Sequence, residues 1–382
     1  MPPGCLQPIQ TEVCRMKRLY ALLFALPLLL FPLTGLAEVS VYTQGSPEVQ
    51  TEDIFPILSD SSGYVEKWEF YIYTRPYEIR IKFEISNFAF SKNEGKVSGY
   101  VKKFGDDGNA VQEYKISKSY KSSQWTASKD SLNLKFGDYT LTLDQATNEF
   151  HLTGLYEKGT FDVVIPSNYW KPGTGNVIFG DSSKNIFKYA IMTYHQPVTS
   201  SVVVEDGVSF RNEGQAYANH YATTMAVYDM FDEVADYRKR SDDLLVEFRY
   251  YVPNQKHQAQ PFGFMFVAWQ GVPILSSTHI DRTTLDTWLD EENYSYEIDA
   301  RQKIVAPDDS TSGNRAEFVM NTADPVPSDP YANLPTFQRN VASRFAKPIE
   351  YSIKIQWDLL LHVDGMDAKI PESGSYSLTR MR

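Results

Sequence analysis

The sequence predicts an all-β protein made of two antiparallel, barrel-like β-domains in tandem. Apolar and polar residues alternate with a period of two over most of the chain beyond residue 38, which places one face of each strand inward. Short turn signals separate these runs, and no long pattern of a βαβ crossover interrupts them. The chain has 382 residues, of which 42% are hydrophobic and 14% aromatic, enough for two cores of ordinary size.

The expected strands follow one another at a spacing typical of antiparallel hairpins. In the clearest strand Ile79, Ile81, Phe83 and Ile85 alternate with charged residues. Segments with the same alternation, enriched in β-branched and aromatic residues, are 68–74, 132–136, 139–143, 244–252, 262–269 and 351–361. Turns are expected where Asn, Asp or Glu precedes Gly, at 93–95, 106–109, 205–207 and 364–365.

Few segments depart from this strand pattern. Leu285, Trp288 and Leu289 follow a spacing of i, i+3, i+4 after Thr283 and Thr284, which predicts one short helix. The proline-rich stretch 324–335 is expected to form one long surface loop.

The stretch 196–201 lies midway along the chain, directly after the strand-like segment 186–194. We expect the division between the two β-domains there. This gives an N-terminal domain of residues 38–198 and a C-terminal domain of residues 199–382.

The first 37 residues differ from the rest and have the pattern of a secretory signal peptide. Arg15, Lys17 and Arg18 precede an apolar run over 19–33, and Gly35-Leu36-Ala37 ends that run. The run is shorter than the roughly 20 apolar residues that a membrane span needs, so a retained anchor is the weaker alternative. We therefore expect an exported protein that begins near Glu38.

The net charge indicates which partners the protein disfavours, and the cysteine content indicates the compartment in which it works. The net charge is −11, which disfavours nucleic acid as a partner because nucleic acid attracts basic proteins. The only two cysteines, Cys5 and Cys14, lie in the segment expected to be removed. A disulfide framework, a thiolate zinc site and a cysteine nucleophile are thereby excluded from the mature chain. Export without disulfides favours a bacterial periplasm.

The usual marks of metal and nucleotide chemistry are missing from the sequence. None of the six histidines shares a metal-ligand spacing with another, and no GxSxG, Walker or Rossmann pattern occurs. The acidic loop 308–313 lacks the spacing and final glutamate of a calcium loop, so we interpret it as a solvated loop. No metal and no cofactor is expected.

The densest constellation of chemically capable residues is the segment 214–221, Gly-Gln-Ala-Tyr-Ala-Asn-His-Tyr. In a strand, Tyr217, Asn219 and Tyr221 share one face, and Ala218 and His220 share the other. A histidine that faces a barrel interior could bind a ligand or act as an acid or base. The alternative is a buried, hydrogen-bonded histidine that fixes a strand.

This segment also carries a family resemblance. Gly214-x-x-Tyr217-x-Asn219-His220 resembles the motif G-x-G-Y-x-D-H-x-W that opens the second half of the tandem-lipocalin superfamily, which includes AttH-like proteins, carotenoid hydratases and fungal survival-factor proteins. Here Ala216 replaces the second glycine, Asn219 the acid and Ala222 the tryptophan. The resemblance implies two lipocalin-like barrels and a hydrophobic small-molecule ligand.

Two functions compete on this basis. The first is a non-catalytic carrier or sequestering protein for a lipid or isoprenoid, with Tyr217, Asn219, His220 and Trp269 as candidate ligand-binding residues and with transient membrane contact allowed. The second is a hydratase, cyclase or isomerase acting on such a molecule, with His220 as the catalytic acid or base. A third, weaker alternative is an interaction protein whose barrels are filled by their own side chains.

Overall fold

The computed structural model describes residues 39–41, 49–87, 92–169, 171–179, 185–241, 243–257, 259–290, 296–309, 313–332, 336, 339–340, 343–344 and 347–381. The signal segment predicted over residues 1–37 lies outside them. Within the described residues, no helix has the length and apolar character needed to cross a membrane.

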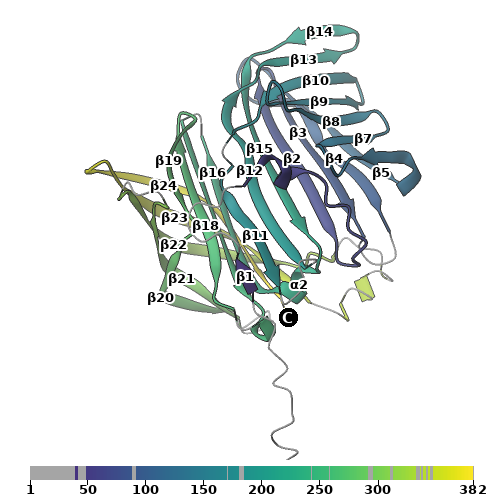
Figure 1. The fold of residues 1–382 in the computed structure, drawn as a ribbon. Helices are drawn as coiled ribbons and strands as arrows, with labels where there is room; N and C mark the ends of the chain where they lie inside the picture. The colour runs from purple at the N-terminus through teal and green to yellow at the C-terminus, as the bar shows by residue number, and fades with distance from the viewer. Residues whose placement is uncertain are drawn as a thin grey trace, which may run out of the picture. The chain divides into compact units, whose positions relative to one another are not determined.

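The first sheet has eight antiparallel strands and carries the motif segment near its centre (Figure 1). Their order across the sheet is β1 (Val39–Val41), β11 (Gly173–Phe179), β12 (Ile186–Pro197), β15 (Gly214–Thr223), β2 (Val65–Thr74), β3 (Tyr77–Ser86), β4 (Glu94–Phe104) and β5 (Ala110–Tyr120).

A second sheet of seven strands covers one face of the first sheet. Its order is β14 (Val208–Arg211), β13 (Ser200–Glu205), β10 (Gly159–Pro166), β9 (Glu149–Tyr156), β8 (Tyr139–Asp144), β7 (Asn133–Phe136) and β6 (Trp125–Ala127). The inward side chains of both sheets, such as Trp68, Phe70, Phe83, Phe136 and Phe150, form one continuous core. The space between these two sheets is therefore filled by the protein's own side chains.

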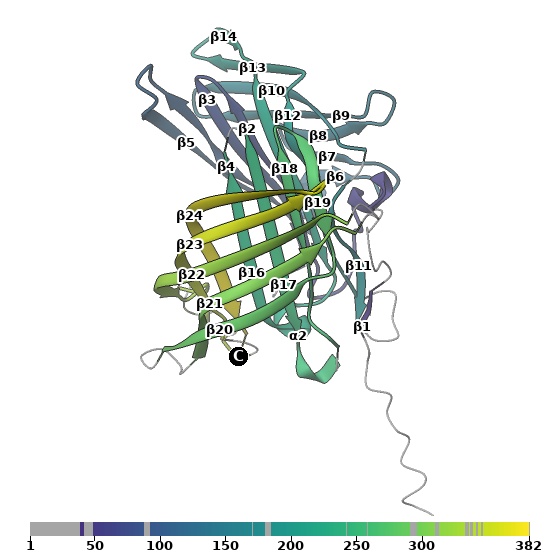
Figure 2. The same ribbon diagram turned by 90° about the vertical axis from the view of Figure 1, so that its left-hand side faces the viewer.

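The third sheet is built from the remaining strands. Its order is β19 (Val272–Ser277), β18 (Phe262–Trp269), β17 (Leu244–Pro253), β16 (Phe231–Arg240), β24 (Met366–Arg380), β23 (Ile349–Val363), β22 (Arg315–Ser328), β21 (Tyr296–Pro307) and β20 (Asp281–Asp290). This sheet curves so that β20–β24 cross in front of β16 and β17 in Figure 2, and it encloses a second core that includes Tyr237, Phe318 and Trp357.

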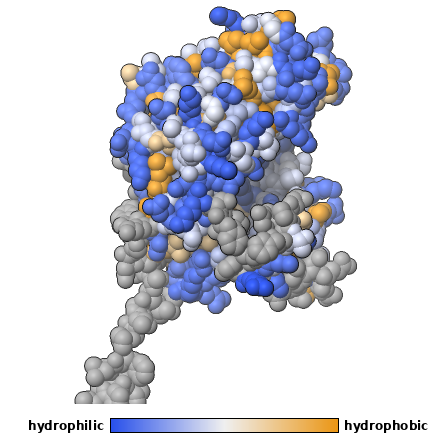
Figure 3. Space-filling model, turned by 90° about the vertical axis from the view of Figure 1, so that its right-hand side faces the viewer, coloured by the Kyte–Doolittle hydropathy of each residue, from blue (hydrophilic) through white to orange (hydrophobic). Residues whose placement is uncertain are grey.

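A third core joins the outer faces of the first and third sheets. Tyr189 on β12 and Tyr217 on β15 meet Phe264 and Phe266 on β18 and Leu245 on β17. The polar site described below lies at the border of this apolar contact. On the face shown in Figure 3, hydrophilic side chains predominate and hydrophobic ones form small separate patches.

Little of the described chain is helical. The single turns are α2 (Val227–Met230) and the 3-10 turns η1 (Thr51–Ile54), η2 (Ser122–Gln124) and η3 (Gln255–His257), and residues 336, 339 and 340 are also helical. The predicted all-β class with antiparallel sheets is thus confirmed, as are the expected strands and the turns at 106–109, 205–207 and 364–365. At the turn Asp364-Gly365, for example, φ is 50° and 78°, a left-handed conformation that glycine adopts without strain.

Two local predictions are wrong. The segment expected to be a short helix around Leu285 and Trp288 is strand β20, because its backbone pairs with β21. The expected loop 324–335 is strand as far as Ser328. A register shift between Ala323 and Val326 leaves Asp324 and Pro325 unpaired, and this irregularity lets the β22–β23 pairing resume beyond the proline.

The division between residues 198 and 199 stays a prediction. The strands show that sheet membership changes later, since β15 still pairs within the first sheet and β16, which begins at Phe231, belongs to the third.

Candidate functional site

Strand β15 separates the motif residues onto two faces, as the alternation predicts. Its neighbour β2 pairs Tyr71 with Tyr217 and Trp68 with His220. Gly214 allows this close pairing, because a Cβ atom there would lie 1.9 Å from the carbonyl oxygen of Tyr73. His220 therefore points into the first core, and Tyr217 points toward the third sheet.

On the inner face, His220 is fully buried and bound to a carboxylate. Its Nε2 lies 2.9 Å from Oε1 of Glu66, and its ring stacks on Trp68 with centroids 5.1 Å apart. Glu66 also accepts hydrogen bonds from the Tyr64 hydroxyl at 2.5 Å and from the Ile57 amide at 2.8 Å. The carboxylate that partners His220 is therefore well satisfied.

Burial lowers the pKa of His220, and the hydrogen bond to Glu66 only partly opposes this effect. The imidazole is therefore neutral near pH 7 and donates to Glu66 from Nε2. Its Nδ1 has no partner among the described residues. These contacts are those of a histidine that fixes a strand, the alternative left open above, and the catalytic role of His220 stays a prediction.

On the outer face, Tyr217 joins a second buried carboxylate. The hydroxyls of Tyr217 and Tyr189 donate to Glu247 on β17 at 2.5 Å and 2.6 Å. Nε of Arg238 lies 3.3 Å from the same carboxylate, and Nε of Arg249 lies 3.0 Å from it. Two tyrosines of the first sheet and two arginines of the third sheet thus share one acceptor.

The charges of this cluster are mutually balanced. Burial by itself raises the pKa of Glu247, but Arg238 and Arg249 outweigh it and lower that pKa to about 2. Arg249 also pairs with Asp236 at 2.8 Å. Burial raises the pKa of both Tyr189 and Tyr217 well above the ordinary value, so both hydroxyls stay protonated donors.

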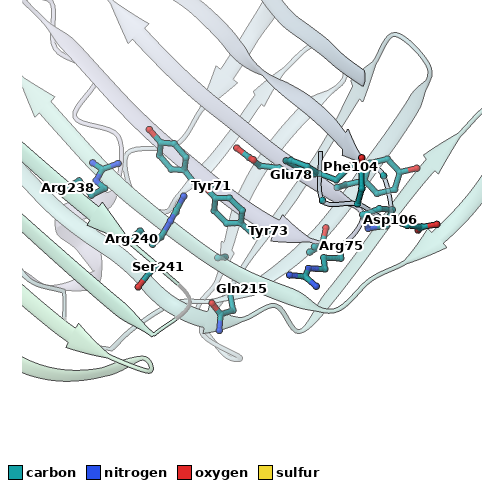
Figure 4. Close-up of a pocket in the computed structure, with 17 residues that line it drawn as sticks. Tyr71, Tyr73, Arg75, Glu78, Phe104, Asp106, Gln215, Arg238, Arg240 and Ser241 are labelled. Carbon is teal, nitrogen blue, oxygen red and sulfur yellow. The ribbon is translucent and has the colours of Figure 1, made fainter. Parts of the chain in front are cut away.

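A cleft of about 950 Å³ opens beside this cluster (Figure 4). β2 contributes Tyr71 and Tyr73, and β16 contributes Arg238 and Arg240. Gln215 of the motif segment also lines the cleft. The walls therefore combine aromatic side chains of the first sheet with guanidinium groups of the third sheet.

Arginines and tyrosines alternate along this wall. The guanidinium carbon of Arg240 lies 4.1 Å from the ring centre of Tyr73 and 5.2 Å from that of Tyr71. The guanidinium carbon of Arg238 lies 4.5 Å from the ring centre of Tyr217. Such cation–π contacts stabilise the positive charge of each guanidinium beside the aromatic rings.

The structure brings together only part of the site expected from the sequence. Tyr217 supports the cleft through Glu247, whereas Asn219 is buried and lies outside the cleft lining. His220 is on the opposite face of β15, and Trp269 is 42% exposed at the end of β18, outside the cleft. None of the four candidates is among the residues that line this cleft.

Glu247, Arg238 and Arg240 were missed by the sequence reasoning. The sequence does contain a sign of them. The segments 234–240 and 244–252 have the pattern of buried strands, yet they carry charged residues at alternate positions. A charge on a strand face that packs against another sheet requires a partner, so such positions are candidates for a polar site.

No cluster of three or more metal-binding side chains occurs in the described part of the chain. The acidic pair Asp308 and Asp309 instead accepts local hydrogen bonds. Asp308 accepts from the Ser276 amide at 3.1 Å, and Asp309 accepts from the Thr278 amide at 2.8 Å.

No protein-family model matches the chain, and no curated protein matches it. Among solved structures it is similar to a protein assigned as AttH from Nitrosomonas europaea, with 11% identity and a TM-score of 0.44 over 82% of this chain and 92% of that one. It is also similar to CghA, both alone (7% identity, TM-score 0.43) and with Sch210972 (8% identity, TM-score 0.42), each over 90% of this chain and 98% of that one.

Proposed function

We propose that this protein binds an apolar small molecule, such as a lipid or an isoprenoid, in the cleft between β2 and β16 and carries or sequesters it. The observation that supports this proposal most is the cleft itself. Its volume of about 950 Å³ lies within the range of about 300–1,000 Å³ typical of small-molecule sites. Its lining combines four aromatic residues, which offer apolar area to a ligand, with charged groups that would bind a polar end of the same molecule.

The interior of the first two sheets offers less room for a ligand. The inward side chains there form a continuous core, and His220 is enclosed between Trp68 and Glu66. A ligand at His220 would have to displace that core. A ligand in the cleft would contact Tyr71 and Tyr73 without displacing buried side chains.

The direct test is a titration of the protein with farnesol, in which isothermal titration calorimetry measures the binding. Gln215→Trp places a large side chain at an exposed position of the cleft wall and is expected to abolish binding. Val208→Trp, at a position 57% exposed on β14 and outside the cleft, is the matched control and should bind like the unaltered protein. Equal binding by both variants would refute the cleft as the site.

Native mass spectrometry of the protein purified from its own host tests whether it is a carrier or an enzyme. A ligand recovered intact supports transport or sequestration. A chemically altered ligand supports the alternative of a hydratase, cyclase or isomerase. In that case the catalytic acid would have to be sought along the cleft lining, where His220 does not lie.

We also propose that the protein is exported to the periplasm and begins near Glu38. The basic residues before the apolar run 19–33 and the small residues after it support this. N-terminal sequencing of protein from a periplasmic extract tests it. An N-terminus that retains residues 19–33 would overturn it.

A further inference from the structure

Two arginines of β16 line the same cleft but differ in what balances their charge. Arg238 is paired with Glu247 at 3.3 Å and donates to the Tyr189 hydroxyl at 3.2 Å. Arg240, two residues further along the same face, has no ion pair and no hydrogen bond to any described residue. Its Nη1 is shielded from solvent.

A shielded guanidinium without an acceptor is costly, since buried polar groups are almost always hydrogen-bonded. The rings of Tyr73 and Tyr71 stabilise its positive charge, but they do not supply the hydrogen-bond acceptor that the shielded Nη1 lacks. Burial lowers the pKa of Arg240 to about 10, with only partial opposition from Tyr71 and Glu247. No described carboxylate offsets that burial in the way that Glu247 does for Arg238.

We propose that Arg240 is the receptor for an anionic head group, and that the cleft selects amphiphiles whose apolar body ends in a carboxylate. This inference rests on the proposed binding function and names the ligand class. Figure 4 shows Arg240 beside Tyr73 and Tyr71. In the proposed complex the carboxylate of the ligand would meet this guanidinium, and the apolar body would lie along the two rings. A guanidinium suits a carboxylate because its planar N–H fork matches the two oxygens.

A carboxylate fits this site better than a more highly charged group. Besides the exposed Arg75, the three carboxylates of Glu78, Asp106 and Asp107 line the same cleft. Their negative charge, together with the net charge of −11 of the chain, repels a dianion. Arg240, whose shielded Nη1 lacks an acceptor among the described residues, balances one negative charge.

The test compares two probes with the same skeleton, farnesoic acid and its methyl ester, at pH 8, where the acid is ionised. We expect the unaltered protein to bind the acid at least about tenfold more tightly than the ester, since a charge-assisted hydrogen bond is worth about 1.5–3 kcal/mol. Arg240→Met keeps an apolar side chain against Tyr73 and should bind both probes with the affinity of the ester. Arg240→Lys should retain part of the preference, because it keeps the charge but loses the fork.

The controls separate this inference from the proposed function. Arg315→Met removes an exposed arginine of β22 outside the cleft and should leave the tenfold preference intact. Gln215→Trp should abolish binding of both probes. Equal binding of acid and ester by the unaltered protein, with both blocked by Gln215→Trp, would overturn the head-group assignment and leave the carrier function standing. Binding of neither probe would overturn both, and an undiminished preference in Arg240→Met would overturn the role of Arg240 alone.

Discussion

The two faces of strand β15 carry two buried carboxylate sites that differ in their electrostatics. On the inner face Glu66 accepts hydrogen bonds from the Tyr64 hydroxyl, the Ile57 amide and His220, and the buried Lys188 acts on it through its charge without a described ion pair. On the outer face Glu247 faces two permanent cations, Arg238 and Arg249. The inner site therefore depends on hydrogen bonds, and the outer site on ion pairing between sheets.

The two sites also differ in their surroundings and in whether a charge beside them lacks a partner. The inner site lies in a filled core, and its histidine is enclosed. The outer site borders an open cleft, and next to it Arg240 is left without a counterion among the described residues. A polar cluster that balances its own charge stabilises the fold, whereas a shielded charge beside a cavity is suited to a ligand.

The largest effect is expected from Glu247→Gln. The variant leaves Arg238 and Arg249 buried without a full counter-charge, so the free energy of unfolding should fall by about 3–5 kcal/mol. Urea denaturation measures it. Glu113→Gln is the control, since it removes a carboxylate from a partly exposed pair with Lys102 and should cost less than about 1 kcal/mol. A similar small loss in both variants would show that the outer site is not held by charge.

A somewhat smaller loss, of about 3 kcal/mol, is expected from His220→Ala. The change removes a buried ring stacked on Trp68 and leaves one oxygen of Glu66 with one partner fewer. The melting temperature should fall while the affinity for farnesol stays unchanged. An unchanged melting temperature with lost binding or turnover would instead assign His220 to the functional site.

The outer site should also make the stability of the protein depend on acid. The folded-state pKa of Glu247 is about 2, below its unfolded value of about 4.3, so its stabilisation is complete above pH 5 and is lost as the pH falls toward 2. The unaltered protein should therefore lose stability over this interval more steeply than Glu247→Gln. Urea midpoints measured from pH 6 to pH 2.5 check this, and parallel curves for the two proteins would contradict it.

The smallest effect on stability is expected from Arg240→Met. Because Arg240 has no ion pair with the described residues, its replacement should lose little more than the contacts with Tyr73 and Tyr71, less than about 1 kcal/mol. Thermal unfolding measures the change. A loss as large as that of Glu247→Gln would mean that Arg240 holds the sheets together, which would remove the reason to assign it to a ligand.

The sequence by itself determined the fold class and most of the strands. Alternation with a period of two sorts side chains onto two faces, and it placed Tyr217 and His220 on opposite sides of β15 as the structure has them. The pattern around Leu285 and Trp288 misled because a spacing of i, i+3, i+4 over seven residues also fits an exposed strand, and pairing with β21 decides which forms.

Only the tertiary structure decided what each face meets. Alternation shows that His220 and Tyr217 diverge, but it does not show that one face packs against the second sheet and the other against the third. Glu247 lies 30 residues from Tyr217 in the chain, and Glu66 lies 154 residues from His220. Partners so distant are brought together by the order of the strands and the packing of the sheets, which local periodicity does not encode.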